Sequence, residues 1–160
     1  MGTVLKAAAD HKGSCFVEVF QNCPVFNDGA YTWMTDKAVK ADVQLRMEEG
    51  KPLLFGKDNK KGIRFNPRTA VLEVVTVGEN GITEADILVH DVGREDPTMA
   101  FMLANLTNTP GFPTPIGVFR DVRSSTVNEI TWQIIAEAKA AKKELSLTEF
   151  LSQGETWKVG

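Results

Sequence analysis

A run of seven residues, Ser14 to Phe20, is apolar at nearly every position and stops just before a cysteine and a proline. Such continuity is typical of strands that are buried on both faces of a parallel sheet. Side chains just beyond the carboxyl end of such a strand face the crevice in which open α/β sheets bind ligands. Cys23, followed by Pro24, is therefore the first candidate for a functional residue.

The residues before this run are expected to form a helix from Thr3 to His11, with apolar residues on one side and Gly13 as its stop. A helix that leads into a doubly buried strand is the last piece of a βαβ crossover. The strand that would precede the helix is not in this sequence, so we expect the opening to be truncated. The expected fold class is α/β.

The middle of the chain is expected to be rich in β-structure, because short apolar or alternating segments are separated by Gly, Pro and polar residues. The expected strands are 42–47, a hairpin of 53–55 with 62–65, 71–77, 87–91 and 116–120. Asp96 and Pro97 are expected to start a helix that runs to about Leu106.

Two capping boxes predict two helices near the end of the chain. Thr126 with Glu129 opens the longer helix, and Ser146 with Glu149 opens a shorter one that ends by Gly154. The longer helix carries an apolar stripe and a polar face of mixed charge, which favours a helix packed on a core. Trp157 in the tail is expected to be a packed aromatic anchor. The apolar stripe consists of Val127, Ile130, Ile134, Ile135, Ala138 and Ala141.

Composition excludes several classes of protein. The net charge is −3, and basic residues are scattered, which argues against a nucleic-acid partner. Lysine groups within 57–61 and 139–143 are expected to be solvated. No apolar run is long enough for a membrane span and no signal peptide is evident, so we expect a cytoplasmic protein without a membrane partner.

The two cysteines are too far apart, in an extended chain, to share a disulfide or a metal. Cys15, mid-strand, is expected to pack as a small apolar residue. No phosphate-binding loop, nucleophile elbow, zinc-binding motif or C-x-x-C is found. A Cys-His hydrolase using Cys23 lacks supporting motifs, and no catalytic residue is predicted. The polar group from His90 to Asp96 could face a ligand, but a strand end running into a helix cap is favoured.

Residues 16–29, Phe-Val-Glu-Val-Phe-Gln-Asn-Cys-Pro-Val-Phe-Asn-Asp-Gly, closely resemble a junction in the β subunit of 2-oxoacid:ferredoxin oxidoreductases, most like the 2-oxoglutarate type. The resemblance covers essentially the whole chain. It continues through His11-Lys12-Gly13, Glu49-Gly50-Lys51-Pro52 with Phe55-Gly56, His90-Asp91 with Glu95-Asp96-Pro97, Gly117-Val118-Phe119-Arg120 and Thr156-Trp157.

In that family the β subunit binds thiamine diphosphate with Mg²⁺ and a 4Fe-4S cluster. The resemblance implies that Cys23 is the fourth, C-terminal ligand of the cluster. It also implies that residues 1–22 are the end of the thiamine-diphosphate-binding domain, a remnant of its last helix-strand unit. Residues 23–160 would form an α+β C-terminal domain. This chain has neither the Gly-Asp-Gly motif for thiamine nor the other three cluster cysteines.

The implied partners are the N-terminal half of the β subunit, the α subunit, ferredoxin, a 2-oxo acid and coenzyme A. The implied reaction is oxidative decarboxylation to an acyl-CoA, and this chain alone is expected to be inactive. Two alternatives stay open. The chain could be a stand-alone interaction or scaffold domain in which Cys23 is a relic, or a thiol redox protein that uses Cys23 alone. The sequence identifies neither the 2-oxo acid nor the oligomeric state.

Overall fold

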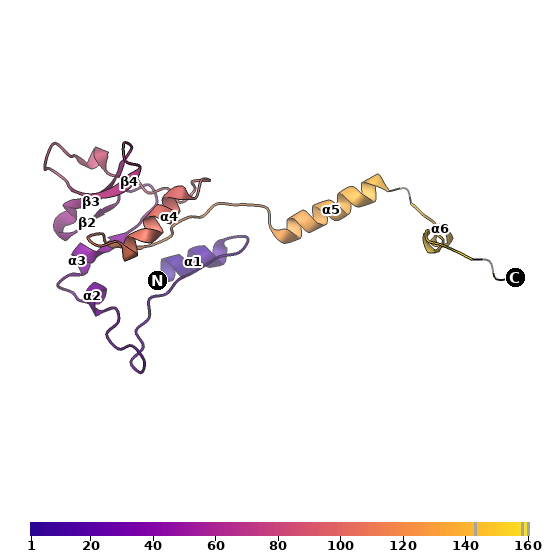
Figure 1. The fold of residues 1–160 in the computed structure, drawn as a ribbon, viewed down its shortest axis with the longest axis horizontal. Coiled ribbons are helices and arrows are strands. Elements are labelled where there is room, and N and C mark those ends of the chain that lie inside the picture. The colour runs from indigo at the N-terminus through magenta and orange to yellow at the C-terminus, as the bar shows by residue number, and fades with distance from the viewer. Residues whose placement is uncertain (143, 158, 160) are drawn as a thin grey trace. The chain divides into compact units, whose positions relative to one another are not determined.

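The computed structural model describes residues 1–142, 144–157 and 159, and divides the chain into two units, Met1–Arg123 and Ser124–Gly160 (Figure 1). Lys143, Lys158 and Gly160, which belong to the second lysine group and to the tail, lie outside the described residues. No helix in the described part is long and apolar enough to cross a membrane. In chain order the elements, with η for 3₁₀ helices, are α1 (Gly2–Asp10), α2 (Thr32–Thr35), α3 (Lys40–Val43), β1 (Gln44–Arg46), β2 (Leu54–Phe55), η1 (Lys57–Asn59), β3 (Lys61–Asn66), β4 (Val71–Thr76), η2 (Glu84–Asp86), α4 (Thr98–Ala104), η3 (Asn105–Asn108), β5 (Thr114–Ile116), α5 (Val127–Ala141) and α6 (Leu147–Leu151).

Two small sheets form the centre of the first unit. Strands β2, β3 and β4 make an antiparallel sheet in that order, and β1 pairs with β5 in parallel. The predicted hairpin and the strand at 71–77 are confirmed. The strand predicted at 116–120 is displaced to Thr114–Ile116, and the one at 42–47 is shortened to Gln44–Arg46. The strand predicted at 87–91 is wrong, since only an isolated bridge joins Val89 to Pro52.

Two glycines allow the close approaches that hold these sheets together. A Cβ on Gly62 would lie 2.5 Å from the Cδ1 of Ile87, so glycine lets Ile87 pack directly on β3. A Cβ on Gly117 would lie 2.6 Å from the carbonyl oxygen of Met47. Gly117 also has φ +153°, a conformation that L side chains rarely adopt, and this turn ends β5 one residue after Ile116.

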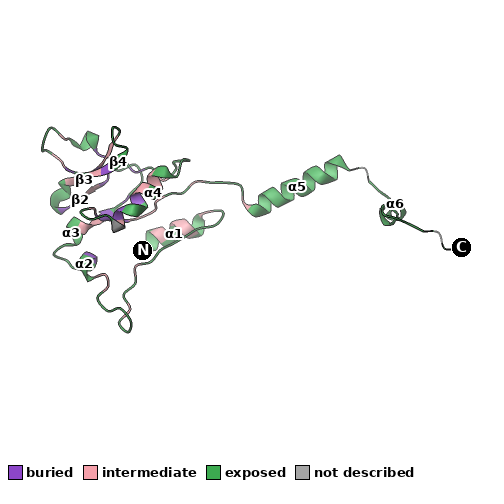
Figure 2. Ribbon diagram, in the orientation of Figure 1, coloured by how far each residue is buried: buried purple, intermediate pink, exposed green. Residues whose placement is uncertain are grey.

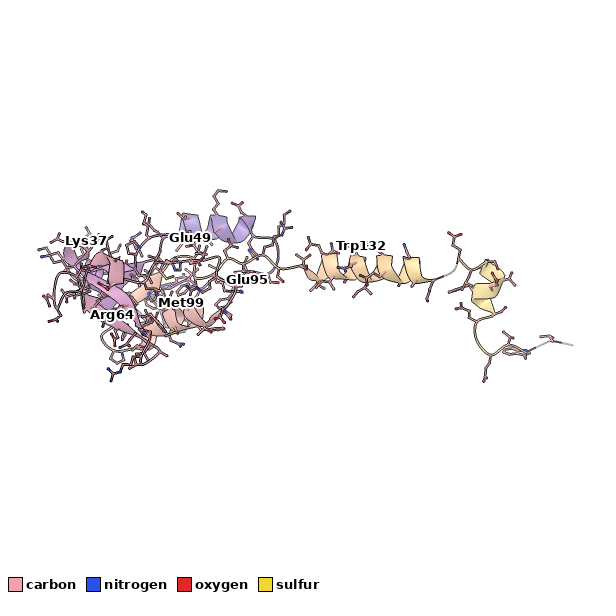
Figure 3. All side chains as sticks on the ribbon, turned by 90° about the horizontal axis from the view of Figure 1, so that it is seen from above. Lys37, Glu49, Arg64, Glu95, Met99 and Trp132 are labelled. Carbon is pink, nitrogen blue, oxygen red and sulfur yellow. The ribbon has the colours of Figure 1, made fainter. Side chains whose placement is uncertain are left out.

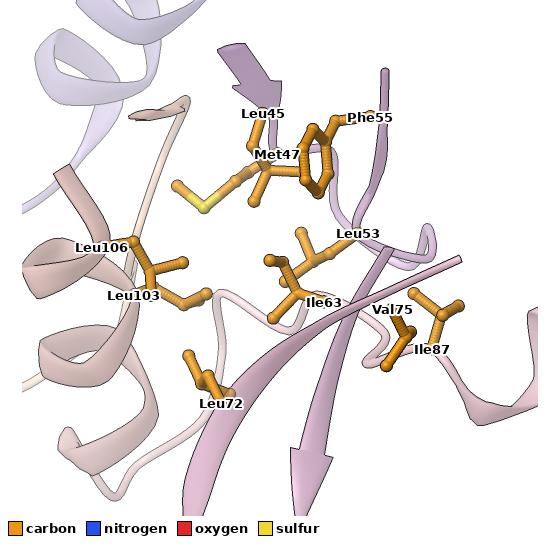
Figure 4. Close-up of a cluster of buried hydrophobic side chains, with 10 residues drawn as sticks. All are labelled: Leu45, Met47, Leu53, Phe55, Ile63, Leu72, Val75, Ile87, Leu103 and Leu106. Atoms are coloured by element: carbon orange, nitrogen blue, oxygen red, sulfur yellow. The ribbon is translucent and has the colours of Figure 1, made fainter. Parts of the chain in front are cut away.

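One apolar core joins both sheets to α4 and η3 (Figure 4). Leu45, Leu53 and Ile63 from the strand region are fully buried, and Leu103 of α4 is 1% exposed. Leu103 and Leu106 face the strand side chains across this core. Burial of each such side chain contributes about 1.5–3 kcal/mol. The core therefore fixes the segment 45–106 as one body.

Each helix of the second unit begins at a capping box formed by residues close together in the sequence. Both predicted capping boxes are present, because the N–H of Glu129 donates to the Thr126 hydroxyl and the N–H of Glu149 donates to the Ser146 hydroxyl. The prediction that α5 packs on a core is wrong here, since α5 has no buried residue (Figure 2). Trp157, predicted to be packed, is 85% exposed.

The first helix is confirmed as α1, but the doubly buried strand at Ser14–Phe20 is wrong for this chain. These residues form no strand, and all except Phe20 are exposed. A strand needs hydrogen-bonding neighbours, and in the described part of the chain none pairs with this run. The mixed α/β class is confirmed. The thiamine-domain remnant and the boundary after residue 22 stay predictions.

Candidate functional site

The segment between α1 and α2 runs out to a turn apart from the two sheets (Figure 1). Cys23 and Asn27 form an isolated antiparallel bridge, and the N–H of Asn27 donates to the carbonyl of Cys23 at 2.9 Å. Pro24 follows the cysteine and has a fixed φ and no N–H. The turn therefore presents the Cys23 side chain on a short closed loop.

Asn22 holds the two ends of this loop together. Its amide Nδ2 donates to the carboxylate of Asp28 at 2.9 Å, and its Oδ1 accepts the N–H of Gly29 at 2.9 Å. The sequence analysis had not singled out Asn22. The signal was present, because an Asn six residues before an Asp-Gly pair is well suited to bridge the two ends of a turn.

Backbone N–H groups of the turn act on the Cys23 thiol. The N–H groups of Phe26, Val25 and Asn27 lower the pKa of the thiol, and partial desolvation opposes them. Donors aimed at a sulfur favour its anionic form, which is both the nucleophile and the metal-binding form. Cys23 is half-buried, so its sulfur is sheltered but accessible. The turn is thus suited to present a thiolate.

The turn and the run before it carry exposed apolar side chains. Val25 is 80% exposed and Phe26 is 91% exposed, and Phe16 earlier in the segment is also 91% exposed. Phe20 is better anchored, because its ring lies 5.3 Å from that of Tyr31 at a tilt of 47°. Large apolar side chains that gather without cover mark surfaces that meet another chain.

Cys15 has a different environment. It is exposed, which contradicts the expectation that it packs in a core, and its thiol donates to the carbonyl of Ala8 at 3.3 Å. Both cysteines are free thiols. Within the described residues, no group of three or more His, Cys, Asp or Glu side chains could hold a metal ion.

The polar group from His90 to Asp96 has structural partners, as the favoured interpretation required. His90 is 3% exposed and its Nε2 lies 2.7 Å from the carbonyl oxygen of Val118. Asp96 accepts the N–H of Thr98 at the start of α4, and hydrogen bonds to Thr98 lower the pKa of its carboxyl. Arg120 donates to the carbonyl of Glu95 at 2.7 Å. These contacts join the loop before α4 to the chain after β5.

His11 extends this network to α1. Its Nδ1 lies 2.7 Å from a carboxylate oxygen of Asp121, which fixes the end of the first helix to the segment after β5. Neither histidine is placed beside Cys23 by any hydrogen bond among the described residues. A Cys-His hydrolase therefore gains no support.

Comparison with known proteins finds a similar protein. The chain is 32% identical over 158 residues to the 2-oxoglutarate oxidoreductase subunit KorB of Mycobacterium tuberculosis (strain H37Rv). The match takes in 98% of this chain but 41% of the relative, so the chain spans less than half of that subunit's length. No family model matches, and no solved structure matches. The chain is thus similar to part of a 2-oxoglutarate oxidoreductase subunit.

Proposed function

We propose that this chain supplies the last protein ligand, the Cys23 thiolate, of a 4Fe-4S cluster in a thiamine-dependent 2-oxoacid:ferredoxin oxidoreductase. The observation that carries the proposal is the Cys23 turn, in which three backbone N–H groups lower the pKa of the thiol. Cluster irons are bound by cysteine thiolates, and hydrogen bonds to the sulfurs help to set the reduction potential. When bound, such a cluster supplies one-electron transfer.

The residues of this chain fit one ligand position of the four. Cys23 would hold the metal, and Asn22 would orient the turn through Asp28 and Gly29. The N–H groups of Val25 and Phe26 would stabilise the anionic sulfur. The other three thiolates, thiamine diphosphate and Mg²⁺ would come from the N-terminal half of the β subunit. The exposed side chains of Phe16 and Phe26 would lie against that half.

In the whole enzyme the reaction would be oxidative decarboxylation of a 2-oxo acid to an acyl-CoA, with electrons passed to ferredoxin. The relative's name supports 2-oxoglutarate as the substrate. An α subunit would complete the assembly. The cofactors would perform the chemistry, and this chain would set the geometry and charge around one sulfur.

The test is co-expression of the chain with an N-terminal half and an α subunit, followed by electron paramagnetic resonance of the reduced complex. Cys23→Ala is expected to abolish the cluster signal and the visible absorption. Cys15→Ala is the matched control, because that thiol is exposed and donates its hydrogen bond to the carbonyl of Ala8. An unchanged signal in Cys23→Ala, or an equal loss in both variants, would contradict the proposal.

The lowered pKa of Cys23 also favours a second candidate, a thiol redox protein that acts without a cluster. Alkylation of Cys23 in the chain alone is then expected to be complete at a pH below that required by free cysteine. An experiment on the assembled complex distinguishes the two candidate functions. Rapid alkylation of Cys23 in a fully assembled enzyme favours the redox protein, whereas protection by the assembled cluster favours the ligand role.

A further inference from the structure

A hollow of about 370 Å³ lies on the first unit where α3, β1, β2 and η1 meet. Its lining includes the apolar Leu54 and the buried Phe55, together with three cations, Lys37, Lys40 and Arg46, which we call the rim. Lys37 lies at the periphery of this unit (Figure 3). No acidic side chain lines the hollow. The volume is within the range of small-molecule sites.

None of the three cations of the rim forms a salt bridge with a described residue, although Arg46 helps to lower the pKa of the Glu48 carboxyl. In the part of the chain that the structure describes, none of them lies within 4.0 Å of an Asp or Glu oxygen. Neighbouring acids have other partners: Asp42 pairs with Lys61 at 3.0 Å, Glu48 pairs with Lys51, and Asp36 accepts the N–H of Ala38 at 2.8 Å. Three like charges around one concave surface repel each other and focus a positive potential there.

The charge of the surrounding segment also favours a positive potential at the hollow. Residues 37–61 contain seven Lys or Arg against four Asp or Glu, whereas the whole chain has a net charge of −3. Two further exposed cations, Lys57 and Lys60, flank Asn59, which also lines the hollow. The excess of positive charge is therefore local, in a chain that is acidic overall.

The backbone of the hollow is also fixed. Gly56 is buried, has φ +85°, and donates its N–H to the carbonyl of Ala41 at 2.8 Å, which ties β2 to α3. The side-chain amide of Gln44 donates to the carbonyl of Met34 at 2.9 Å and holds β1 against α2. The elements that carry Lys40 and Arg46 are thus held in place before any ligand arrives.

We infer that this hollow binds a small organic phosphate, with the phosphate on Lys37, Lys40 and Arg46 and an apolar part of the ligand over Leu54. A small phosphate fits better than an acidic protein, because the three cations line one hollow together with the apolar Leu54 and Phe55. The assignment does not depend on Cys23, so either proposal can fail without the other.

The experiment is titration of the full 160-residue chain with inorganic pyrophosphate, monitored by amide chemical shifts in NMR. Saturable shifts are expected in residues 40–46 and 54–59. The triple variant Lys37→Gln, Lys40→Gln, Arg46→Gln should weaken the apparent affinity at least roughly tenfold, since each charged hydrogen bond is strong. The control Lys12→Gln, Lys139→Gln, Lys142→Gln has the same change of charge at exposed sites and should leave affinity unchanged.

Three results would overturn the inference: no saturable shift, an equal loss of affinity in the control, or tighter binding of poly-glutamate than of pyrophosphate at the same residues. The last result would assign the surface to an acidic protein. If the triple variant loses the native amide spectrum, the single variant Arg46→Gln is titrated with pyrophosphate in its place. It should weaken pyrophosphate binding while the spectrum is kept, and unchanged binding would refute the assignment.

Discussion

The segment 45–106 and the two regions on either side of it use apolar residues in opposite ways. In the segment, ten apolar side chains from Leu45 to Leu106 are buried in one cluster. In the run 14–20 and in α5, side chains of the same kind are exposed, including Phe16 at 91% and Ile134 at 59%. The contrast is visible in Figure 2, where α5 is exposed along its whole length.

The difference shows which part of the fold this chain specifies by itself. A segment whose apolar residues meet each other gains the free energy that offsets the loss of chain entropy. A segment whose apolar side chains do not pack on each other lacks this gain within the chain. We expect such a segment to gain it by packing on a partner. The exposed regions include the residues nearest to Cys23 in sequence, in agreement with a site that another chain completes.

The largest effect is expected from the core. Leu103→Ala should lower the free energy of unfolding by about 2–5 kcal/mol, because Leu103 is 1% exposed and its loss leaves a cavity. The matched control is Phe101→Ala on the same helix, since Phe101 is 65% exposed and should cost within about 0.5 kcal/mol. Urea denaturation of both variants measures the difference. An equal loss of unfolding free energy in both variants would contradict the buried position of Leu103.

The next effect concerns the junction of β1 and β5. Gly117→Ala should destabilise by roughly 2–3 kcal/mol, because the new Cβ meets the Met47 carbonyl and φ is strained. Gly111→Ala separates the two causes, since Gly111 also has a positive φ but nothing within 4 Å of the new Cβ. Gly111→Ala should lower the free energy of unfolding by about 1 kcal/mol. A larger cost at Gly111 than at Gly117 would show that the close approach to Met47 does not matter.

A smaller effect tests whether α5 depends on local signals only. Thr126→Ala removes the hydroxyl that caps the Glu129 N–H and should lower helix stability by about 1 kcal/mol. Thr131→Ala makes the same chemical change inside the helix, where alanine has the higher helix propensity, and should raise stability. Circular dichroism of the full chain measures both. If both variants change helix stability in the same direction, packing rather than capping stabilises α5.

Local chemistry explains what the sequence could predict. The capping boxes at Thr126 and Ser146 and the hairpin around Gly62 each depend on residues a few positions apart, and each formed as expected. The helix expected from Pro97 to about Leu106 is α4, which begins one residue later and ends at Ala104. Some errors concern strand bounds, at 42–47, 87–91 and 116–120, and the larger ones concern burial.

The apolar pattern of 14–20 predicted a doubly buried strand, but a pattern cannot tell whether the neighbouring strands are in the same chain. The pattern of α5 misled in the same way. For the candidate site, the sequence singled out Cys23 and Pro24. It could not show the backbone donors of Val25 and Phe26 or the basic rim of Lys37, Lys40 and Arg46, which depend on how the turn and the strands are placed.

The smallest effect on folding, and the sharpest test of the contrast, is expected at Phe16. Phe16→Ser should change the free energy of unfolding of the chain by no more than about 0.5 kcal/mol, because the ring is 91% exposed. The same variant should reduce recovery of the chain with a co-expressed N-terminal half of the β subunit, since a doubly buried position would then receive a hydroxyl. Phe101→Ser is the control with an exposed ring outside the Cys23 region. Lost stability without lost assembly would mean that the run serves this chain's own core, and the proposed completion of the Cys23 site by another chain would lose its main support.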